Sequence, residues 1–244
     1  MKVPYAHILA FADRPFRGNP AAVIALPEWR DDATLQAIAA ELSLPATTFL
    51  VGAEIRWFSP IREIGLCGHG TLAAGHFVLA GDPARESATF NTRDARALTV
   101  TRTGDGYALA LPALPPSPEA LPDIGVLAVE TLRHAGGYHV YVLRDEAAVR
   151  AFTPGALPAG AQTTVTAPGT ETDVVSRVFS PYEDAVTGSA HAVIAPYWAA
   201  RLGRDRFTAF QASARGGRID CRLDGDRVIL TGGCVTVIEG TIFV

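Results

Sequence analysis

The sequence predicts an α+β protein of two similar domains, in which each domain is a barrel-like, mostly antiparallel sheet wrapped around a central helix. Three observations lead to this fold class. A motif of strand, turn, glycine and helix occurs twice, its two helices are apolar on nearly every face, and short alternating segments typical of strands surround both copies. A helix that is apolar all round must be buried, and the surrounding strands are available to cover it.

The repeated motif is the strongest internal match in the chain. It begins with RWFSP at 56–60 and RVFSP at 177–181, and it continues to CGHG at 67–70 and TGSA at 187–190. Each copy then enters an apolar, alanine-rich run, TLAAGHFVLAG at 71–81 or HAVIAPYWAARLG at 191–203. We therefore expect a buried helix over each run, closed by Gly81 in the first copy and by Gly203 in the second.

Short segments of alternating apolar residues predict the strands. In the first half these are HILAFA, AAVIAL, TTFLVG, IRWFS, ALTVTR and YALAL, and in the second half YHVYVL, TTVTA, VVSRVFS, RFTAFQA, RIDCRL and RVILTG. The proline-rich stretch LPALPPSPEALP, at about 111–122, is typical of a linker. We expect an N-terminal domain over 1–114, completed by a C-terminal strand at about 236–244, and a C-terminal domain over 115–235.

The composition favours a small molecule as the partner. The 244 residues carry a net charge of −4 with both signs interspersed, so no basic run is present to bind nucleic acid or an anionic membrane surface. Asp13 and Arg14 interrupt the N-terminal apolar stretch, unlike a signal peptide, and no run approaches the roughly 20 apolar residues that span a bilayer. Three cysteines without a C-x-x-C pair indicate neither a disulfide framework nor a zinc site. We therefore expect a cytoplasmic protein.

The two glycine-to-helix turns are the candidate site. A glycine before a buried helix permits a sharp turn and leaves the first N–H groups of the helix without intrahelical acceptors. If the two halves are related by an approximate twofold axis, the N–H groups near 68–71 and 188–191 converge on one substrate carboxylate or developing enolate. Such a site can labilise a C–H bond beside a carboxyl group.

Polar side chains near these turns could move protons or bind substrate. His69 could transfer a proton, donate a hydrogen bond or cap the helix. Asp184 could accept a proton, bind a substrate amine or cap its helix. Thr187 and Ser189 could bind the substrate carboxylate through hydroxyl and backbone groups. His191 is either a packed polar residue or a catalytic one, and the other histidines show no ligand spacing with a carboxylate, so we expect no metal.

Four stretches resemble a known family. FADRPFRGNPAAVI, IRWFSPIREIGLCGHGTLAAGHFVLAG, SRVFSPYEDAVTGSAHAVIAPYWAARLG and FQASARGGRI are similar to the signatures of the PhzF-like (phenazine biosynthesis-like) family, within the diaminopimelate epimerase-like fold. The resemblance spans nearly the whole chain. It implies a homodimeric isomerase that shifts protons on a small carboxylic acid in a biosynthetic pathway, without metal, flavin, nicotinamide or pyridoxal phosphate.

The resemblance also implies roles for individual residues in a cleft between the two halves. Its catalytic histidine falls on His69, its catalytic aspartate on Asp184 and its substrate-binding serine on Ser189. The remaining matches are glycines at the helix starts and residues that line the cleft, which are Gly68, Gly70, Thr71, Thr187, Gly188, Asn19, Gly216 and Gly217.

One position departs from the family pattern. Where relatives carry a catalytic glutamate, the stretch LSLPATTFL places Ala46, and an alanine cannot carry a proton. Either a substitution has removed the base, for example to hold a substrate in place, or the protein naturally uses another group or does not isomerise. The intact L-S-L-P and T-x-F on either side favour a substituted glutamate.

Two other functions remain open. A catalytically silent protein could have kept the cleft for binding and lost the base, which Ala46 supports and the intact His69, Asp184 and Ser189 oppose. An amino-acid epimerase would use two opposed cysteines, and Cys67 suits the first place. Its partner position holds Thr187, whose hydroxyl is far too weak an acid to act as the second thiol.

Overall fold

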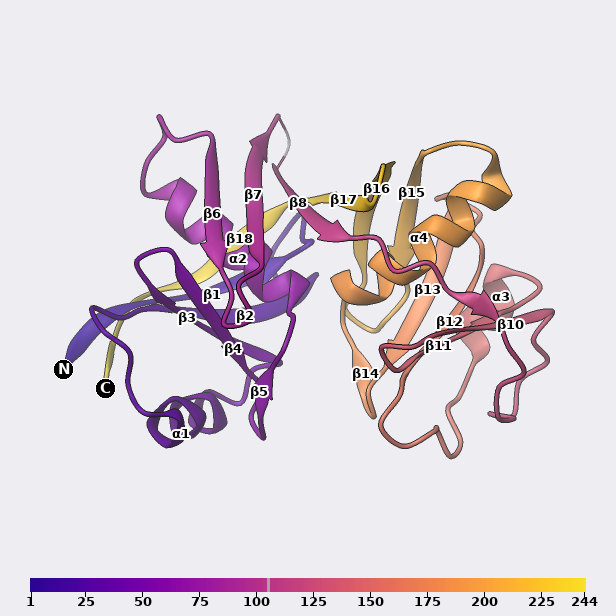
Figure 1. Ribbon diagram of the computed structural model, residues 1–244, viewed down its shortest axis with the longest axis horizontal. Coiled ribbons are helices and arrows are strands. Elements are labelled where there is room, and N and C mark those ends of the chain that lie inside the picture. The colour runs from indigo at the N-terminus through magenta and orange to yellow at the C-terminus, as the bar shows by residue number, and fades with distance from the viewer. Residues whose placement is uncertain (105) are drawn as a thin grey trace. The chain divides into compact units, whose positions relative to one another are not determined.

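The chain forms two compact units in the computed structural model, which describes residues 1–104 and 106–244. Unit 1 comprises Met1–Ala110 and Thr231–Val244, and unit 2 comprises Leu111–Leu230. The chain passes from unit 1 to unit 2 within β8 (Gly106–Pro112) and returns within β17 (Arg227–Gly232), as the colours of Figure 1 show. These bounds lie within a few residues of the expected 1–114 and 115–235.

Unit 1 places a mixed sheet around helix α2 (Gly68–Ala80). From β18 (Cys234–Phe243), the sheet continues antiparallel through β1 (Lys2–Ala10) to β2 (Asn19–Ala25), which is parallel to β3 (Ala46–Val51). Helix α2 packs against β1, β2, β3, β6 and β7, and helix α1 (Asp32–Leu42) packs on β3 and β4. The other strands are β4 (Glu54–Phe58), β5 (Glu63–Ile64), β6 (Ser87–Asn91) and β7 (Ala97–Thr103).

Unit 2 repeats this order around helix α4 (Gly188–Leu202). Strand β11 (Tyr138–Val142) is parallel to β12 (Gln162–Pro168), β12 is antiparallel to β13 (Val174–Phe179), and β13 is parallel to β15 (Arg206–Gln211). Unit 1 has the same sequence of parallel, antiparallel and parallel pairs in β2, β3, β4 and β6. The remaining elements are β9 (Ser117–Pro118), β10 (Glu130–His134), β14 (Glu183–Asp184), β16 (Gly217–Asp224) and helix α3 (Glu146–Ala151).

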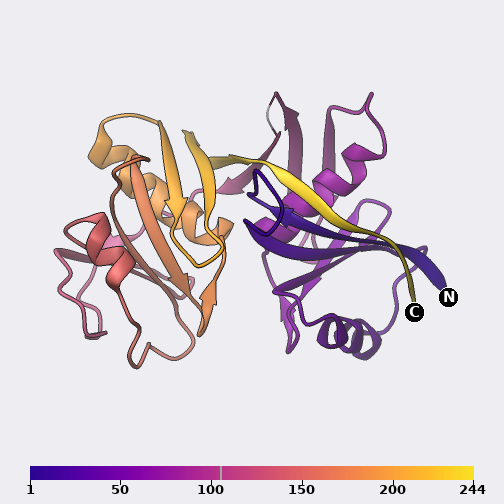
Figure 2. The ribbon, with the colours of Figure 1, turned by 180° about the vertical axis from the view of Figure 1, so that it is seen from behind.

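The two predicted central helices are confirmed, and each begins earlier than its apolar run, at the glycine itself. Figures 1 and 2 show α2 and α4 each lying against the strands of its own unit. Most residues of both helices are buried, and burying a side chain such as Leu72 or Leu79 contributes roughly 1.5–3 kcal/mol. Antiparallel ladders predominate, as expected, although each unit also contains parallel ladders.

Each sheet carries a second apolar layer on the face away from its central helix. In unit 1, Phe49 and Phe58 meet edge to face with ring centroids 5.6 Å apart, over helix α1. In unit 2, Phe152 and Phe179 make the same contact at 5.5 Å, next to helix α3. Successive strand residues point to opposite faces, so these aromatic layers leave the inner face of each sheet for the central helix.

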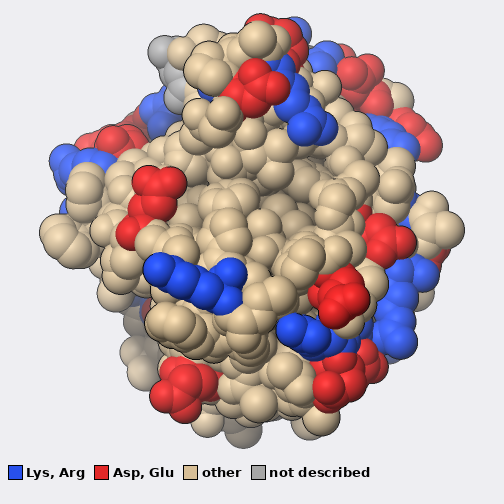
Figure 3. Space-filling model, turned by 90° about the vertical axis from the view of Figure 1, so that its left-hand side faces the viewer, with Lys and Arg blue, Asp and Glu red and all other residues tan. Residues whose placement is uncertain are grey.

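The surface agrees with the interspersed charges of the sequence. On the side viewed in Figure 3, basic and acidic side chains lie near one another around an uncharged centre, with no broad area of one sign. No helix of the described residues is long and apolar enough to cross a membrane.

Candidate active site

Helix α2 has a buried first turn. Its N-cap residue Cys67 has φ −131° and ψ 100°, and the Cys67 side chain makes no capping hydrogen bond among the described residues. Gly68, His69 and Gly70 follow and are buried. At Thr71 both the N–H and Oγ1 donate to the Cys67 carbonyl oxygen, at 3.0 and 2.6 Å. The three preceding N–H groups therefore have no acceptor within the helix.

Helix α4 begins in the same way. Its N-cap Thr187 has φ −116° and ψ 100°, again with no side-chain capping bond in the part of the chain described. At His191, the N–H and Nδ1 both contact the Thr187 carbonyl oxygen, at 3.2 and 2.8 Å. A carbonyl oxygen only accepts, so Nδ1 carries the imidazole proton. Burial lowers the pKa of His191 to about 4, so the ring is neutral near pH 7 and serves the helix start structurally.

Gly70 lets helix α2 approach the sheet closely. A Cβ atom at this position would lie 2.8 Å from Thr48 Oγ1, 2.9 Å from Trp57 Cδ1 and 3.0 Å from Cys67 Sγ. Thr48 Oγ1 also donates to the Gly70 carbonyl oxygen at 3.3 Å. Gly70, the second glycine of the C-G-H-G motif, is thus required by packing between the helix start and strands β3 and β4.

His69 lies against the thiol of Cys67 and is 7% exposed. Its Nδ1 and Nε2 atoms lie 3.6 and 3.9 Å from Cys67 Sγ. Ala46, the first residue of β3, is completely buried. Because residues two apart on a strand point to the same face, Ala46 faces the α2 side, as Thr48 does.

The internal repeat shows what a longer side chain at position 46 would reach. Ala46 and Gln162 hold matching positions, because the residue after each pairs with the phenylalanine of the repeated R-x-F-S-P motif. In unit 2, Ser189 Oγ donates to Gln162 Oε1 at 3.5 Å. Ser189 is the second residue of α4, as His69 is of α2. A polar side chain of similar length at position 46 would therefore lie beside His69.

Asp184 sits in the short strand β14 and is held by its own turn. Its Oδ2 accepts a hydrogen bond from Thr187 Oγ1 at 2.6 Å, and its Oδ1 accepts from the Ala185 N–H at 3.0 Å. The Thr187 N–H donates to Gln211 Oε1 at 2.8 Å. Both donors of Thr187 are engaged within the protein, so Thr187 supports the site through Asp184.

Gln211 is a residue that the sequence analysis missed. It is completely buried at the end of β15, opposite Gly217 in the ladder with β16. Nearby, Gly216 has φ +65° and donates its N–H to Ser213 Oγ at 3.1 Å. The two glycines selected from the sequence thus lie beside Gln211. Only its place in the stretch FQASARGGRI could have drawn attention to it, because an uncharged glutamine gives no chemical signal.

Asn19 begins β2 and is completely buried. The preceding Gly18 has φ +67°, and a Cβ there would lie 2.3 Å from the Ala10 carbonyl oxygen, so only glycine fits this turn. Two residues after Asn19, Ala21 pairs with Ala46 in the parallel ladder. The starts of β2 and β3 therefore lie together.

The predicted site residues fall into two groups, each around one helix start. Unit 1 holds Asn19, Ala46, Gly68, His69, Gly70 and Thr71, whereas unit 2 holds Asp184, Thr187, Gly188, Ser189, Gly216 and Gly217. In residues 1–104 and 106–244, no group of three or more His, Cys, Asp or Glu side chains is arranged to hold a metal ion.

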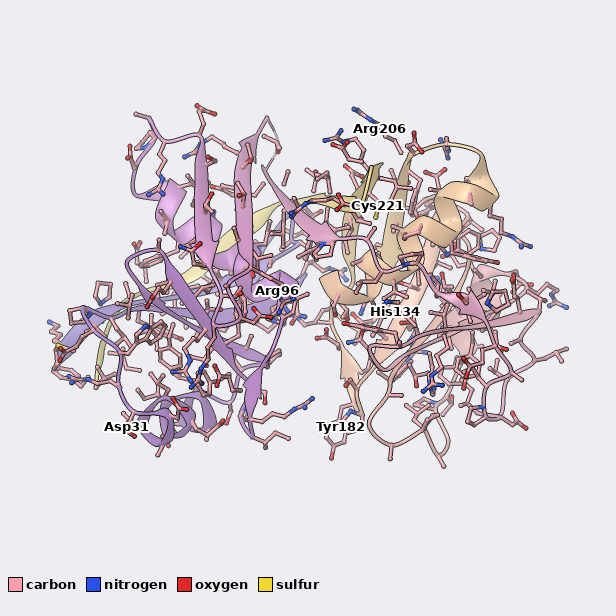
Figure 4. All side chains as sticks on the ribbon, in the orientation of Figure 1. Asp31, Arg96, His134, Tyr182, Arg206 and Cys221 are labelled. Carbon is pink, nitrogen blue, oxygen red and sulfur yellow. The ribbon has the colours of Figure 1, made fainter. Side chains whose placement is uncertain are left out.

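An arginine–glutamate pair anchors the turn before each helix. Arg56 Nε and Nη2 donate to Glu63 at 2.7 and 2.9 Å, and Arg177 donates in the same way to Glu183 at 2.6 and 3.1 Å. The hydrogen bond from Arg56 holds the pKa of Glu63 below its usual value. Gly65 lies in the segment between Glu63 and helix α2, and its carbonyl oxygen accepts a hydrogen bond at 2.9 Å from Arg96, which is labelled in Figure 4. These contacts fix the segment that leads into each helix.

Comparison with known families decides the relationship. Residues 8–115 and 139–240 match the sequence model of the PhzC-PhzF family, described as phenazine biosynthesis-like protein. The chain belongs to the phenazine biosynthesis-like family. An uncharacterized isomerase of Pseudomonas aeruginosa is 41% identical over 99% of both chains. The phenazine biosynthesis-like domain-containing protein of Homo sapiens is 33% identical, also over 99% of both.

Solved structures agree with this assignment. A PhzF family protein from Enterococcus faecalis superposes with a TM-score of 0.91 at 38% identity, over 100% of both chains. A hydroxyproline epimerase from Agrobacterium vitis superposes with a TM-score of 0.65 at 10% identity, over 99% of this chain and 92% of that one, and this likeness shows the fold alone. The family and the epimerase-like fold expected from the sequence are confirmed, and close relatives of this phenazine biosynthesis-like protein are named isomerases.

Proposed function

We propose that this protein is a cofactor-independent isomerase that moves a proton on a small amino-acid-derived or unsaturated carboxylic acid. The observation that supports the proposal best is the repeated helix start. In each unit, a buried first turn has N–H groups without acceptors in the helix, and such ends bind carboxylates and the oxyanions that form when a neighbouring carbon loses a proton.

In this proposal some groups bind the substrate and others transfer its proton. The first-turn N–H groups bind the substrate carboxylate, and the Ser189 hydroxyl turns from Gln162 Oε1, 3.5 Å away, to donate to the same carboxylate. Asp184, a carboxylate fixed by its own turn, accepts a proton or binds a substrate amine. His69 donates a hydrogen bond to the negative charge that develops when the carbon loses its proton. Both His69 and Asp184 are required for turnover, so loss of either one stops the reaction.

The base is the missing part. A carboxyl group at position 46 would lie beside His69, and full burial of that position would raise its pKa towards neutrality, as suits a group that takes and returns a proton. The methyl group of Ala46 can do neither. We propose that the present chain binds its acid and isomerises it poorly.

The test restores the base. Solvent deuterium incorporation, followed by proton NMR in D2O, would be measured on a panel of small amino acids and unsaturated carboxylic acids. Ala46→Glu is expected to raise the exchange rate by about 100-fold or more, the lower bound for a positioned general base, with little change in Kd. Ala46→Gln has the same size but cannot carry a proton, so it should leave the rate unchanged.

Controls in the restored enzyme assign the other roles. With Ala46→Glu in place, His69→Ala and Asp184→Asn should each remove the added exchange while circular dichroism stays unchanged. If the present chain already exchanges protons rapidly and Ala46→Glu adds nothing, the base lies elsewhere and the assignment of position 46 is wrong.

A silent binding protein is the second candidate, and Ala46 favours it. In that case, calorimetry would detect binding of a panel acid to both the present chain and the Ala46→Glu variant, and neither would exchange protons. An epimerase with two thiols has less support. Cys67 and Thr187 hold matching N-cap positions, but the Thr187 hydroxyl donates to Asp184 and is far too weak an acid.

A further inference from the structure

Gln211 is bonded to the segment between Asp184 and helix α4 at three points. Its Oε1 accepts from the Thr187 N–H at 2.8 Å, and its Nε2 donates to the Asp184 carbonyl oxygen at 2.7 Å and to Thr187 Oγ1 at 3.2 Å. The side chain is completely buried. One amide group thus spans the whole turn that carries the proposed catalytic aspartate.

The direction of these bonds is fixed by chemistry. The amide nitrogen of a glutamine can only donate a hydrogen bond, so Thr187 Oγ1 must accept from Gln211 Nε2. The single proton of that hydroxyl is then directed to Asp184 Oδ2, 2.6 Å away. The chain of bonds runs from Gln211 through Thr187 to Asp184, and it makes the hydroxyl a permanent donor to the carboxylate.

The fold itself does not require this chain of bonds. Asn91 of β6 pairs with Glu54 of β4, and Phe210 of β15 pairs with Val175 of β13. Glu54 and Val175 hold matching positions, because each lies two residues before the arginine of the R-x-F-S-P motif. The residue after Asn91 is Thr92 in unit 1, and the residue after Phe210 is Gln211 in unit 2. Thr92 Oγ1 instead accepts from the Arg96 N–H at 3.0 Å, within its own turn. A barrel of the same design therefore forms with a short side chain at this place.

We infer that Gln211 is a positioning residue, which orients the Thr187 hydroxyl and thereby holds the Asp184 carboxylate in the geometry that proton transfer requires. This inference rests on the proposed role of Asp184. It assigns Thr187 to the support of Asp184 and not to direct contact with substrate. A misplaced catalytic carboxylate lowers the rate of the chemical step more than it weakens binding.

The test is a double-mutant cycle in the Ala46→Glu enzyme, with turnover measured as deuterium exchange. Gln211→Glu keeps the size and the acceptor for the Thr187 N–H but replaces the donor. Thr187→Val removes the hydroxyl. Each is expected to lower kcat by about 10-fold to 100-fold with KM changed less than about threefold, and the double variant should be no slower than the slower single variant. Thr187→Ser, which keeps the hydroxyl, should retain the rate.

A matched control and a second readout keep the result decisive. Gln36→Glu makes the same change in unit 1, where Gln36 Nε2 also donates to a backbone carbonyl oxygen, at 2.9 Å from Ser59 O, and it should leave kcat unchanged. If Gln211→Glu does not fold, Gln211→Met replaces it in the cycle. Additive losses, or equal rates for Thr187→Val and Thr187→Ser, would overturn the inference.

Failure of the proposed function is separable from failure of this inference. If no panel acid is turned over, crystal structures of the variants still decide whether Gln211 orients the hydroxyl. The inference expects Thr187 Oγ1 to leave hydrogen-bond distance of Asp184 Oδ2 in Gln211→Glu and to keep it in Gln36→Glu. An unchanged Thr187 rotamer in Gln211→Glu would contradict it.

Discussion

Among the residues that the structure describes, the His191 ring has one hydrogen-bond partner, and its pKa lies far below that of a free histidine. Its Nδ1 donates to the carbonyl oxygen of the N-cap residue Thr187, and the whole ring is buried. In unit 1 the same bond is made by the hydroxyl of Thr71. The repeat therefore keeps the hydrogen bond and changes the side chain, and of the two only the histidine can take up a proton in acid, which places a charge in a buried site.

Stability should therefore fall on mild acidification because of His191. Its pKa is about 4 in the folded protein and 6.5 when exposed, so below pH 6.5 the unfolded chain binds one proton more than the folded chain. The free energy of unfolding should decrease from pH 6.5 to about pH 4, by on the order of 3 kcal/mol in total from this group.

His191→Asn measures this contribution. The asparagine amide nitrogen can replace Nδ1 as a donor but does not titrate, so urea unfolding between pH 7 and pH 4 should show a shallower loss of stability than in the unmodified chain. Parallel pH profiles for the two proteins would mean that His191 does not set the acid limit.

The residues that the sequence identified and those that it missed differ in a physical way. Gly70 and His69 were found because a glycine turn before an apolar run is a local pattern. Gln211 acts only because β15 and β13 pair in parallel and bring it beside Thr187, and such a pairing is not written in any local segment. That Ala46 and Gln162 hold matching positions in the two units is likewise known only from the strand registers.

At the scale of elements, the Arg56–Glu63 pair joins the short strand β5 to β4. The guanidinium side chain is 10% exposed and makes two bonds to one carboxylate, and it also donates to Asp32 at 2.8 Å. Partly buried, bidentate pairs are stronger than solvent-exposed ones, because less of the attraction is lost to water. We expect the pair to hold the turn that leads to α2.

A double-mutant cycle with Arg56→Met and Glu63→Gln should give a coupling energy of about 1–2 kcal/mol at pH 7. Because Arg56 lowers the pKa of Glu63, the coupling should be complete above the ordinary value of 4.5 and disappear as the pH falls below it. The exposed pair of Arg133 and Glu119, at 2.9 Å, is the control and should couple by less than about 0.5 kcal/mol. Equal couplings would contradict the distinction.

The elements themselves were predictable to different degrees. Long apolar runs gave the helices α2 and α4, whereas β6 alternates over only five residues, SATFN, with two apolar side chains, and β10, ETLRH, has no alternating pattern. The expected strand HILAFA ends at Ala10, because Phe11 takes the left-handed conformation with φ +57°. Helix α3 owes its start to the Asp145 carboxylate, which accepts from the Ala148 N–H at 2.8 Å, and it is too short to show a period.

At the scale of the whole molecule, unit 1 is assembled from both ends of the chain. Strand β1 pairs with β18 from Lys2 opposite Phe243 to Ala10 opposite Cys234. Unit 2 is a continuous segment. Removal of the C-terminal strand should therefore damage one unit and spare the other.

A chain that ends at Gly233 tests this. Hydrogen exchange followed by mass spectrometry should show loss of protection in β1 and β2, while β11, β12 and β13 keep theirs. A chain that ends at Ile242 loses the pairing of Phe243 with Lys2 and the bonds of Val244 to Met1, keeps the rest of β18 and should resemble the full protein. Loss of protection in both units at once would show that they unfold together.

The pairing of β1 with β18 also determines the order in which the nascent protein can fold. On the ribosome, β1 must wait for β18, and synthesis of the chain from Ala10 to Cys234 at 5–20 residues per second takes about ten to fifty seconds. During that interval unit 2 can complete its own sheet, but β1 emerges with an open edge, and unpaired edges attract other strands. In a newly made chain, the edge of β1 that later pairs with β18 therefore stays open to other strands until β18 has been made.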